Sequence, residues 1–299
     1  MKRNINGKKI LIGILVLILL ISIGMNIYFL ASDENYDPMV NYLRDPWQIR
    51  IVETGILQNH LEFRPGTDYE ITYDFENEEY PILMEQYDLE KLAGEGSEFE
   101  QAFNLMNEFG PRLSHQGDFG NTVEMNALSL LEYSLDRPDC GINCRNKAQI
   151  LNEMCLALGI YARKVWIMPN SVYDNECHVV NEIWDSTLEK WVMLDITNNQ
   201  YWVDAEGTPL SVLEVRELGA KQEFCTPVFP GQELDNLEKA LNNNYGIYLY
   251  FMKNLVYMEY CDTQTVGETD TVYYLLPENM SMECELVISE EAVMCSPVK

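Results

Sequence analysis

Between residues 98 and 135, apolar positions recur at helical spacing and predict two helices. A helix is predicted from Glu98 until Gly110, because the apolar positions between them step by three or four residues. These positions are Phe99, Phe103, Met106 and Phe109. A second helix is predicted from Val123 to Leu135, ending before Pro138.

A third predicted helix begins at Cys144. Its apolar positions step by three, four and three residues and share one face; they are Ala148, Leu151, Cys155 and Leu158. Gly159 favours the left-handed cap that ends a helix. Strands are then predicted at 163–168, 177–184 and 191–196, the last two joined by a short polar turn at 185–190.

The flanking patterns divide the chain into five parts. Residues 1–9 form a basic tail and 10–31 an apolar segment. Residues 32–98 are expected to be strand-rich, because Tyr69 to Tyr73 alternates like a half-buried strand. Residues 99–225 form the predicted core. Residues 226–299 are an accessory segment, whose strand-like pieces at 272–276 and 283–288 predict either a separate sheet or an extension of the main one.

The apolar segment from Ile10 to Ala31 has 22 residues and no charge. At 1.5 Å per residue, a helix of this length crosses a hydrocarbon core of about 30 Å. The alternative is a cleaved signal peptide, but its apolar region is normally shorter and ends in small residues, whereas Phe29 and Leu30 precede Ala31. We expect a single-pass anchor in the cell membrane, with the basic N-terminus cytoplasmic and the following domain extracytoplasmic.

Charge and cysteine content narrow the function classes. The net charge of −28 opposes binding to nucleic acid, so we expect none. Eight cysteines occur, and disulfides are permitted outside the cytoplasm. A working thiol would leave an odd number, so at least one more cysteine is free or paired between chains. Connectivity and oligomeric state stay open, and we expect no cofactor and no metal.

Cys144, His178 and Asp195 are the candidate catalytic residues. A thiol in the first turn of a helix meets the positive end of the helix dipole, which favours the nucleophilic thiolate. An imidazole nearby lowers the thiol pKa further and carries protons during acyl transfer, while a carboxylate holds its ring. If residues 186–189 close a hairpin, Val180 faces Asp195 and strand parity places His178 on the same face. A loop one residue longer or shorter would turn Asp195 away.

Each residue also has a plain structural interpretation. Cys144 could be a small buried side chain or pair with Cys140, His178 could be a core histidine, and Asp195 could cap the next turn. A zinc site is a further alternative. Its ligands would be Cys140, Cys144, Cys177 and His178. Because Cys177 and His178 are adjacent on a strand, they would point to opposite faces, which disfavours joint ligation.

The segments around these residues resemble the core of the transglutaminase-like superfamily, whose fold is related to papain-like cysteine proteases. The resemblance covers about 139–202. It is carried by Gly141 to Cys144 with Ala148, by 158–163 (Leu-Gly-Ile-Tyr-Ala-Arg), by the strand from His178 and by 191–197, a Trp-led strand that ends in Asp-Ile-Thr. It implies an α+β fold with the cysteine helix packed on an antiparallel sheet that bears histidine and aspartate.

By this resemblance Cys144 is the nucleophile, His178 the base and Asp195 the orienting group. The sequence departs from the family at four positions. Tyr161 and Ile196 stand where Pro is common, and Val179 and Val180 replace Ala-Trp. The backbone N–H of Cys144 is a natural oxyanion donor. The side-chain donor stays open between His115 and Gln116, which also read as a plain loop.

We therefore expect a cysteine-dependent acyltransferase or peptidase that acts on a protein or peptide. The Cys144 thiolate would attack an amide carbonyl and form a thioester, which an amine or water resolves by crosslinking, deamidation or proteolysis. The alternative is a catalytically silent module that kept the fold as a binding scaffold at the cell surface.

Overall fold

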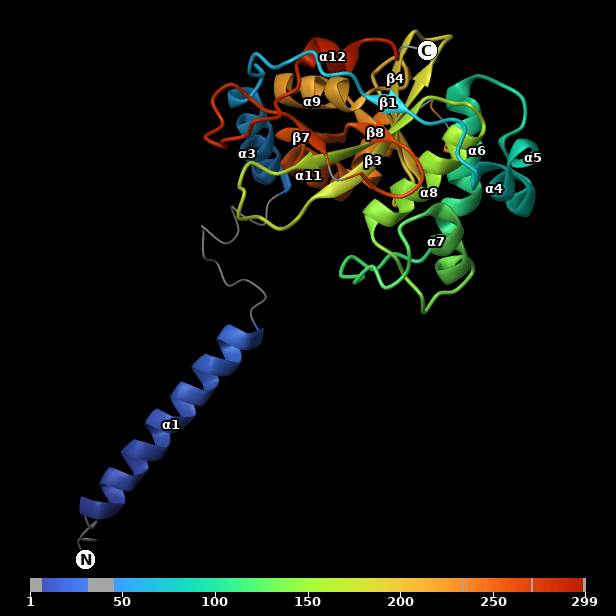
Figure 1. The fold of residues 1–299 in the computed structure, drawn as a ribbon. Helices are drawn as coiled ribbons and strands as arrows, with labels where there is room; N and C mark the ends of the chain where they lie inside the picture. The colour runs from blue at the N-terminus through green and yellow to red at the C-terminus, as the bar shows by residue number, and fades with distance from the viewer. Residues whose placement is uncertain (1–6, 32–45, 233, 235, 270, 298–299) are drawn as a thin grey trace, which may run out of the picture. The chain divides into compact units, whose positions relative to one another are not determined.

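A seven-stranded antiparallel sheet organises the chain (Figure 1). The computed structural model describes residues 7–31, 46–232, 234, 236–269 and 271–297. The sheet order is β6-β5-β4-β3-β2-β7-β9, and β1 pairs with β8 apart from it. The strands are β1 Thr72–Tyr73, β2 Ala162–Met168, β3 His178–Asp185, β4 Lys190–Asp195, β5 Gln200–Val203, β6 Thr226–Val228, β7 Tyr257–Cys261, β8 Thr263–Gln264 and β9 Val272–Leu275.

Helices cover both faces of the sheet (Figure 1). The helices of the described residues are α1 Gly7–Ala31, α3 Pro46–Asn59, α4 Tyr80–Tyr87, α5 Leu89–Ala93, α6 Glu98–Phe109, the 3₁₀ turn η1 Gly110–Arg112, α7 Ala127–Ser134, α8 Cys144–Ala157, α9 Val212–Lys221, α10 Leu237–Asn243, α11 Tyr245–Asn254 and α12 Glu290–Met294. Helices α4 to α8 share one core with the sheet, whereas α3, α9 and α11 share the other.

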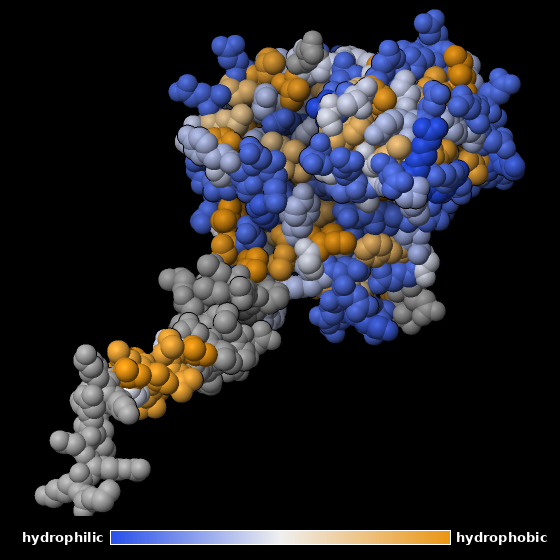
Figure 2. Space-filling model, turned by 90° about the horizontal axis from the view of Figure 1, so that it is seen from below, coloured by the Kyte–Doolittle hydropathy of each residue, from blue (hydrophilic) through white to orange (hydrophobic). Residues whose placement is uncertain are grey.

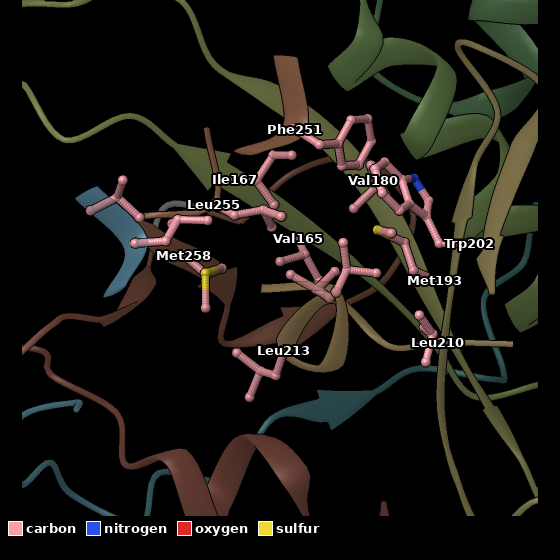
Figure 3. Close-up of a cluster of buried hydrophobic side chains, with 14 of the residues drawn as sticks. Val165, Ile167, Val180, Met193, Trp202, Leu210, Leu213, Phe251, Leu255 and Met258 are labelled. Atoms are coloured by element: carbon pink, nitrogen blue, oxygen red, sulfur yellow. The ribbon is translucent and has the colours of Figure 1, made fainter. Parts of the chain in front are cut away.

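The two cores separate along the alternation of β2 and β3. Val165 and Val180 enter the core that also holds Trp202 and Phe251, and Figure 3 shows Val180 beside these two rings. Ala162 and Ile183 enter the other core, beneath α8. Both faces of the central strands are therefore buried, so the polar side chains of β3 need hydrogen-bond or ion-pair partners inside the protein.

The helices and strands predicted in the middle of the chain are confirmed, with small shifts at their ends. Helix α6 spans Glu98–Phe109, and a capping box between Ser97 and Glu100 fixes its start. Helix α7 is shorter than expected and begins at Ala127, because the Asn126 side chain caps it there. Gly159 follows α8 with a positive φ of 76°, as a cap requires.

The stretch 32–98 is not rich in strands, and that expectation is wrong for its described part. Residues 46–98 hold α3, α4 and α5, while only Thr72–Tyr73 forms a strand. The strand expectation rests on the alternation at 69–73 alone. Further along, Tyr80, Leu83 and Tyr87 step by three and four residues, which is helical spacing. Residues 32–45 lie outside the described residues.

The C-terminal segment extends the main sheet. Strand β7 pairs with β2 and then with β9, so 257–275 continue the sheet that bears His178. The piece at 283–288 forms no strand and makes single bridges through Val287 and Ile288. Residues Ile49–Lys299 form one compact unit, and Met1–Gln48 form another.

Helix α1 displays apolar side chains along its described length, as Figure 2 shows in orange. Among them Leu15 is 56% exposed and Leu19 is 59% exposed. Within the part of the chain that the structure describes, no helix is long and apolar enough to cross a membrane.

Candidate active site

Cys144 is the first residue of α8. The Asn143 side chain accepts a hydrogen bond of 3.1 Å from the Asn146 backbone N–H, and the Asn146 side chain accepts one of 3.1 Å in return. This reciprocal cap fixes the helix start at the thiol. Because the first N–H groups of a helix lack partners within the helix, the thiol meets the positive end of the dipole.

The hairpin that carries His178 and Asp195 has the register predicted from the sequence. Glu182 pairs with Met193 and Trp184 with Trp191, and residues 186–189 close the loop. Strand parity therefore places His178 and Asp195 on one face. Nε2 of His178 lies 3.0 Å from Oδ2 of Asp195, and both side chains are buried.

Asp195 has hydrogen-bond donors on both carboxylate oxygens. Oδ1 accepts the backbone N–H groups of Thr197 and Asn198 at 3.0 and 3.2 Å. Oδ2 accepts the side chains of Asn198 at 2.7 Å and Gln200 at 3.1 Å besides His178. Asp195 therefore caps the turn after β4 and also orients the imidazole, so the two interpretations of this residue hold together. Asn198 and Gln200 are site residues that the sequence motifs do not point to, although two amides so soon after an aspartate are a usable signal.

Cys144 and His178 line the same cavity, and each shifts the pKa of the other. Since Nε2 of His178 faces Asp195, Nδ1 remains for the sulfur. Burial disfavours the thiolate, but the hydrogen bond and charge of His178 outweigh it, and the backbone N–H of Val179 also donates to the sulfur, so the Cys144 pKa is lowered.

The pKa shifts of His178 and Asp195 favour the charged forms of both side chains. Burial lowers the pKa of His178, yet Asp195 and the Cys144 sulfur overcome it, and the net shift is upward. Burial raises the pKa of Asp195, but the His178 charge and the donors around the carboxylate lower it overall. The site is therefore set up to hold a thiolate, an imidazolium and a carboxylate.

The thiol opens on a cavity of about 620 Å³. Helix α11 supplies part of its wall through Gly246, Ile247 and Tyr250. The Tyr250 hydroxyl donates to the carbonyl of Cys177 at 3.2 Å, and its ring packs edge-on to His178 with centroids 5.7 Å apart. Helix α11 lies in the segment expected to be accessory (226–299), and no local sequence pattern links it to β3, where His178 lies 72 residues before Tyr250.

The geometry of the described residues gives no support to a Cys140–Cys144 disulfide or to the zinc site. All eight cysteines are free, including Cys140 and Cys144. Among the described residues, no group of three or more His, Cys, Asp or Glu side chains is arranged to hold a metal ion.

The two candidates for the side-chain oxyanion donor, His115 and Gln116, differ in placement. His115 and Gly117 line the cavity with Cys144. Gln116 instead lies against the backbone before α8, where a Cβ on Gly141 would come 2.8 Å from the Cβ of Gln116. Lys147, which the sequence analysis did not single out, is buried one turn after Cys144 and donates to the carbonyl of Leu113 at 2.6 Å.

Comparison with known proteins identifies the segment that holds the three residues. Residues 86–196 match the family model described as the Transglutaminase-like superfamily. The match runs from within α4 to just past β4 and includes Cys144, His178 and Asp195. No curated protein and no solved structure matches the chain.

Proposed function

We propose, from the premise that residues 86–196 are a transglutaminase-like domain, that this chain is a cysteine-dependent acyltransferase or hydrolase. The observation that carries the proposal is the His178–Asp195 hydrogen bond of 3.0 Å at the wall of a cavity that Cys144 also lines. A cysteine that only fills the core does not require a buried imidazole nearby. Here the imidazole of His178 lies 3.0 Å from the Asp195 carboxylate, which also accepts several other hydrogen bonds.

The reaction begins with the thiolate of Cys144. It attacks the carbonyl carbon of an amide, the C–N bond breaks, and the His178 imidazolium gives its proton to the leaving nitrogen. A thioester then joins the acyl group to Cys144. An amine or water attacks this thioester, the C–S bond breaks, and the neutral His178 takes a proton from the attacking group, which restores the starting charges. Asp195 keeps the ring in position throughout.

The substrate class that we propose is a protein or peptide amide. The cavity has walls from α8, β3 and α11, and it lies open beside the thiol, so an extended chain can reach the sulfur. A scaffold module that only binds is the competing function. It would need neither a lowered thiol pKa nor the donors that surround Asp195.

Thiol alkylation tests the proposal. Iodoacetamide should modify Cys144 of the full-length protein with a midpoint well below the ordinary thiol pKa of about 8.5, because the imidazolium stabilises the thiolate. His178→Ala should move this midpoint upward, and Cys144→Ala should abolish the labelled peptide while leaving the fold intact. A Cys144 midpoint at or above 8.5 would leave the scaffold function as the better account.

The reaction products show whether an amine or water accepts the acyl group. Incubation with casein and a fluorescent primary amine should yield labelled casein if an amine is the acceptor, whereas release of ammonia or of new peptide ends points to water. Cys144→Ala is the control for each product.

We also propose that α1 tethers the domain to a membrane, with the domain on the extracytoplasmic side. The support is the uncharged run from Ile10 to Ala31 behind a basic tail, and the exposure of Leu15 and Leu19. After alkaline carbonate extraction the chain should stay in the membrane pellet. The double variant L15D/L19D should move to the supernatant; recovery of the unaltered chain there would refute the tether.

A further inference from the structure

We propose that His115 is the residue that positions the incoming acyl acceptor, a water molecule or a primary amine, over the thioester on Cys144. The inference rests on the proposed function, because it concerns the second half of that reaction. It assigns distinct tasks to the two histidines that line the cavity.

The backbone holds His115 at a fixed place beside the thiol. His115 forms a parallel bridge with Ile142, two residues before Cys144. Two hydrogen bonds secure the bridge, from Gln116 N–H to the Ile142 carbonyl at 2.9 Å and from Ile142 N–H to the Ser114 carbonyl at 3.0 Å. Lys147 binds the carbonyl of Leu113 and secures the start of the same segment to α8.

The close approach at Gly141 strengthens this arrangement. A Cβ there would come 2.8 Å from the Gln116 Cβ and 3.2 Å from the Gln116 backbone nitrogen. Gly141 therefore lets the segment that carries His115 pack directly against the residues that lead into Cys144. The backbone of His115 is held by its bridge to Ile142, while the residue is exposed and lines the cavity.

The charge state of the ring follows from its neighbours. Burial, then the charge of Lys147 and then that of His178 lower the pKa of His115, while Asp195 and the bond with Ile142 oppose the shift. His115 is therefore neutral under conditions that keep His178 protonated. Two like groups whose pKa values are driven apart mark different roles in a site. A neutral imidazole has one N–H and keeps a lone pair on its other nitrogen, so it can accept a hydrogen bond.

The lone pair of His115 can accept a hydrogen bond from the attacking water or amine. It cannot bind the acyl oxygen, which itself has no hydrogen to donate. Water and primary amines each carry at least two hydrogens on the attacking atom. During thioester cleavage one proton passes to His178, and the second hydrogen can bind the free nitrogen of His115, so the lone pair of the attacking atom points at the carbonyl carbon. The acylation step needs no such contact, because the thiolate is its nucleophile.

The two half-reactions can be separated with p-nitrophenyl acetate as the probe. In the full-length protein, acylation of Cys144 releases a burst of p-nitrophenolate, and the steady rate that follows reports hydrolysis of the thioester. His115→Leu should keep the burst rate and amplitude and lower the steady rate by about 10-fold or more. His115→Gln should restore part of it, because the amide oxygen accepts a hydrogen bond. The matched control is Gln116→Ala on the same segment, which should change neither phase.

Each outcome has one meaning. A steady rate in His115→Leu equal to that of the unaltered chain overturns the inference. A parallel fall of burst and steady rates also overturns it, because that pattern indicates a structural role. If the unaltered chain gives no burst beyond that of Cys144→Ala, the proposed function itself fails and the inference with it.

Discussion

The Asn181 side chain donates a hydrogen bond of 2.9 Å to the backbone carbonyl of Ala148. This bond ties β3, which begins at His178, to α8, which begins at Cys144, one turn below the thiol. Among the described residues, Oδ1 of Asn181 has no hydrogen-bond partner. Burial of this unpaired oxygen is unfavourable. The Asn181 side chain therefore contributes more to the placement of β3 against α8 than to stability.

Asn181→Leu should reduce the reactivity of Cys144 while leaving stability little changed. The bond contributes about 0.5–1.5 kcal/mol, and the unsatisfied oxygen costs about 1–3 kcal/mol, so the two effects offset each other. Loss of placement by about 1 Å should slow acylation about 10- to 100-fold. Burst kinetics and urea unfolding measure the two quantities.

Asn152→Leu is the control for this substitution. Asn152 is also buried on α8, and within the described residues neither polar atom of its side chain has a partner. This variant should leave the burst rate unaltered. Equal kinetics for the two variants would show that the bond to Ala148 does not position the thiol.

Glu182→Gln should destabilise the fold strongly. Oε2 of Glu182 accepts Nη2 of Arg163 at 2.6 Å, Oε1 accepts the Val212 N–H at 2.9 Å, and both charged side chains are buried. Loss of the negative charge leaves the guanidinium uncompensated over the Trp191 ring, which costs about 3–5 kcal/mol. Urea unfolding measures the loss.

The exposed pair of Asp88 and Lys91 provides the comparison. These side chains are 67% and 79% exposed, so Asp88→Asn should change the free energy of unfolding by less than about 1 kcal/mol. A loss at Glu182 as small as that at Asp88 would contradict the predicted cost of an unpaired buried charge.

Gly141→Ala should destabilise the site without touching the triad. The new Cβ would press on Gln116 at 2.8 Å and shift the segment that carries His115. Overpacking of this kind costs about 1–3 kcal/mol. Thermal unfolding gives the stability, and the deacylation rate should fall with it. Gly120→Ala is the control, because its Cβ would meet nothing within 4 Å. Equal effects at the two glycines would refute the close approach.

The ring signals of the histidines should titrate far apart. The chain has only three histidines, so each signal can be assigned by one substitution. In the NMR spectrum His115 should titrate below the ordinary value of about 6.5, while His178 should remain protonated through neutral pH. Lys147→Met removes a positive neighbour of His115 and should raise its midpoint. A midpoint that does not respond to this change would remove the electrostatic basis for a neutral His115.

Short-range features of the sequence predict the local chain geometry around the candidate site. Helical spacing after Cys144, the glycine at 159 and the alternation of 178–184 and 191–195 are short-range features, so α8 and the hairpin followed from them. The four-residue loop 186–189 set the register, and the register set the face that His178 and Asp195 share. The alternation at 69–73 predicts a strand but carries no information on 80–87, where α4 forms.

Tertiary structure decided what surrounds these residues. Helix α11 packs Tyr250 and Phe251 against His178 from more than 70 residues downstream. Lys147 binds the carbonyl of Leu113, two residues before His115, only because the segment 113–117 returns to the start of α8. The sequence by itself determined which residues can form a thiolate, an imidazolium and their carboxylate, because helix phase and strand parity are local properties. Their pKa shifts and the neutral second imidazole arise from burial and from charges far apart in the chain, which only the folded chain brings together.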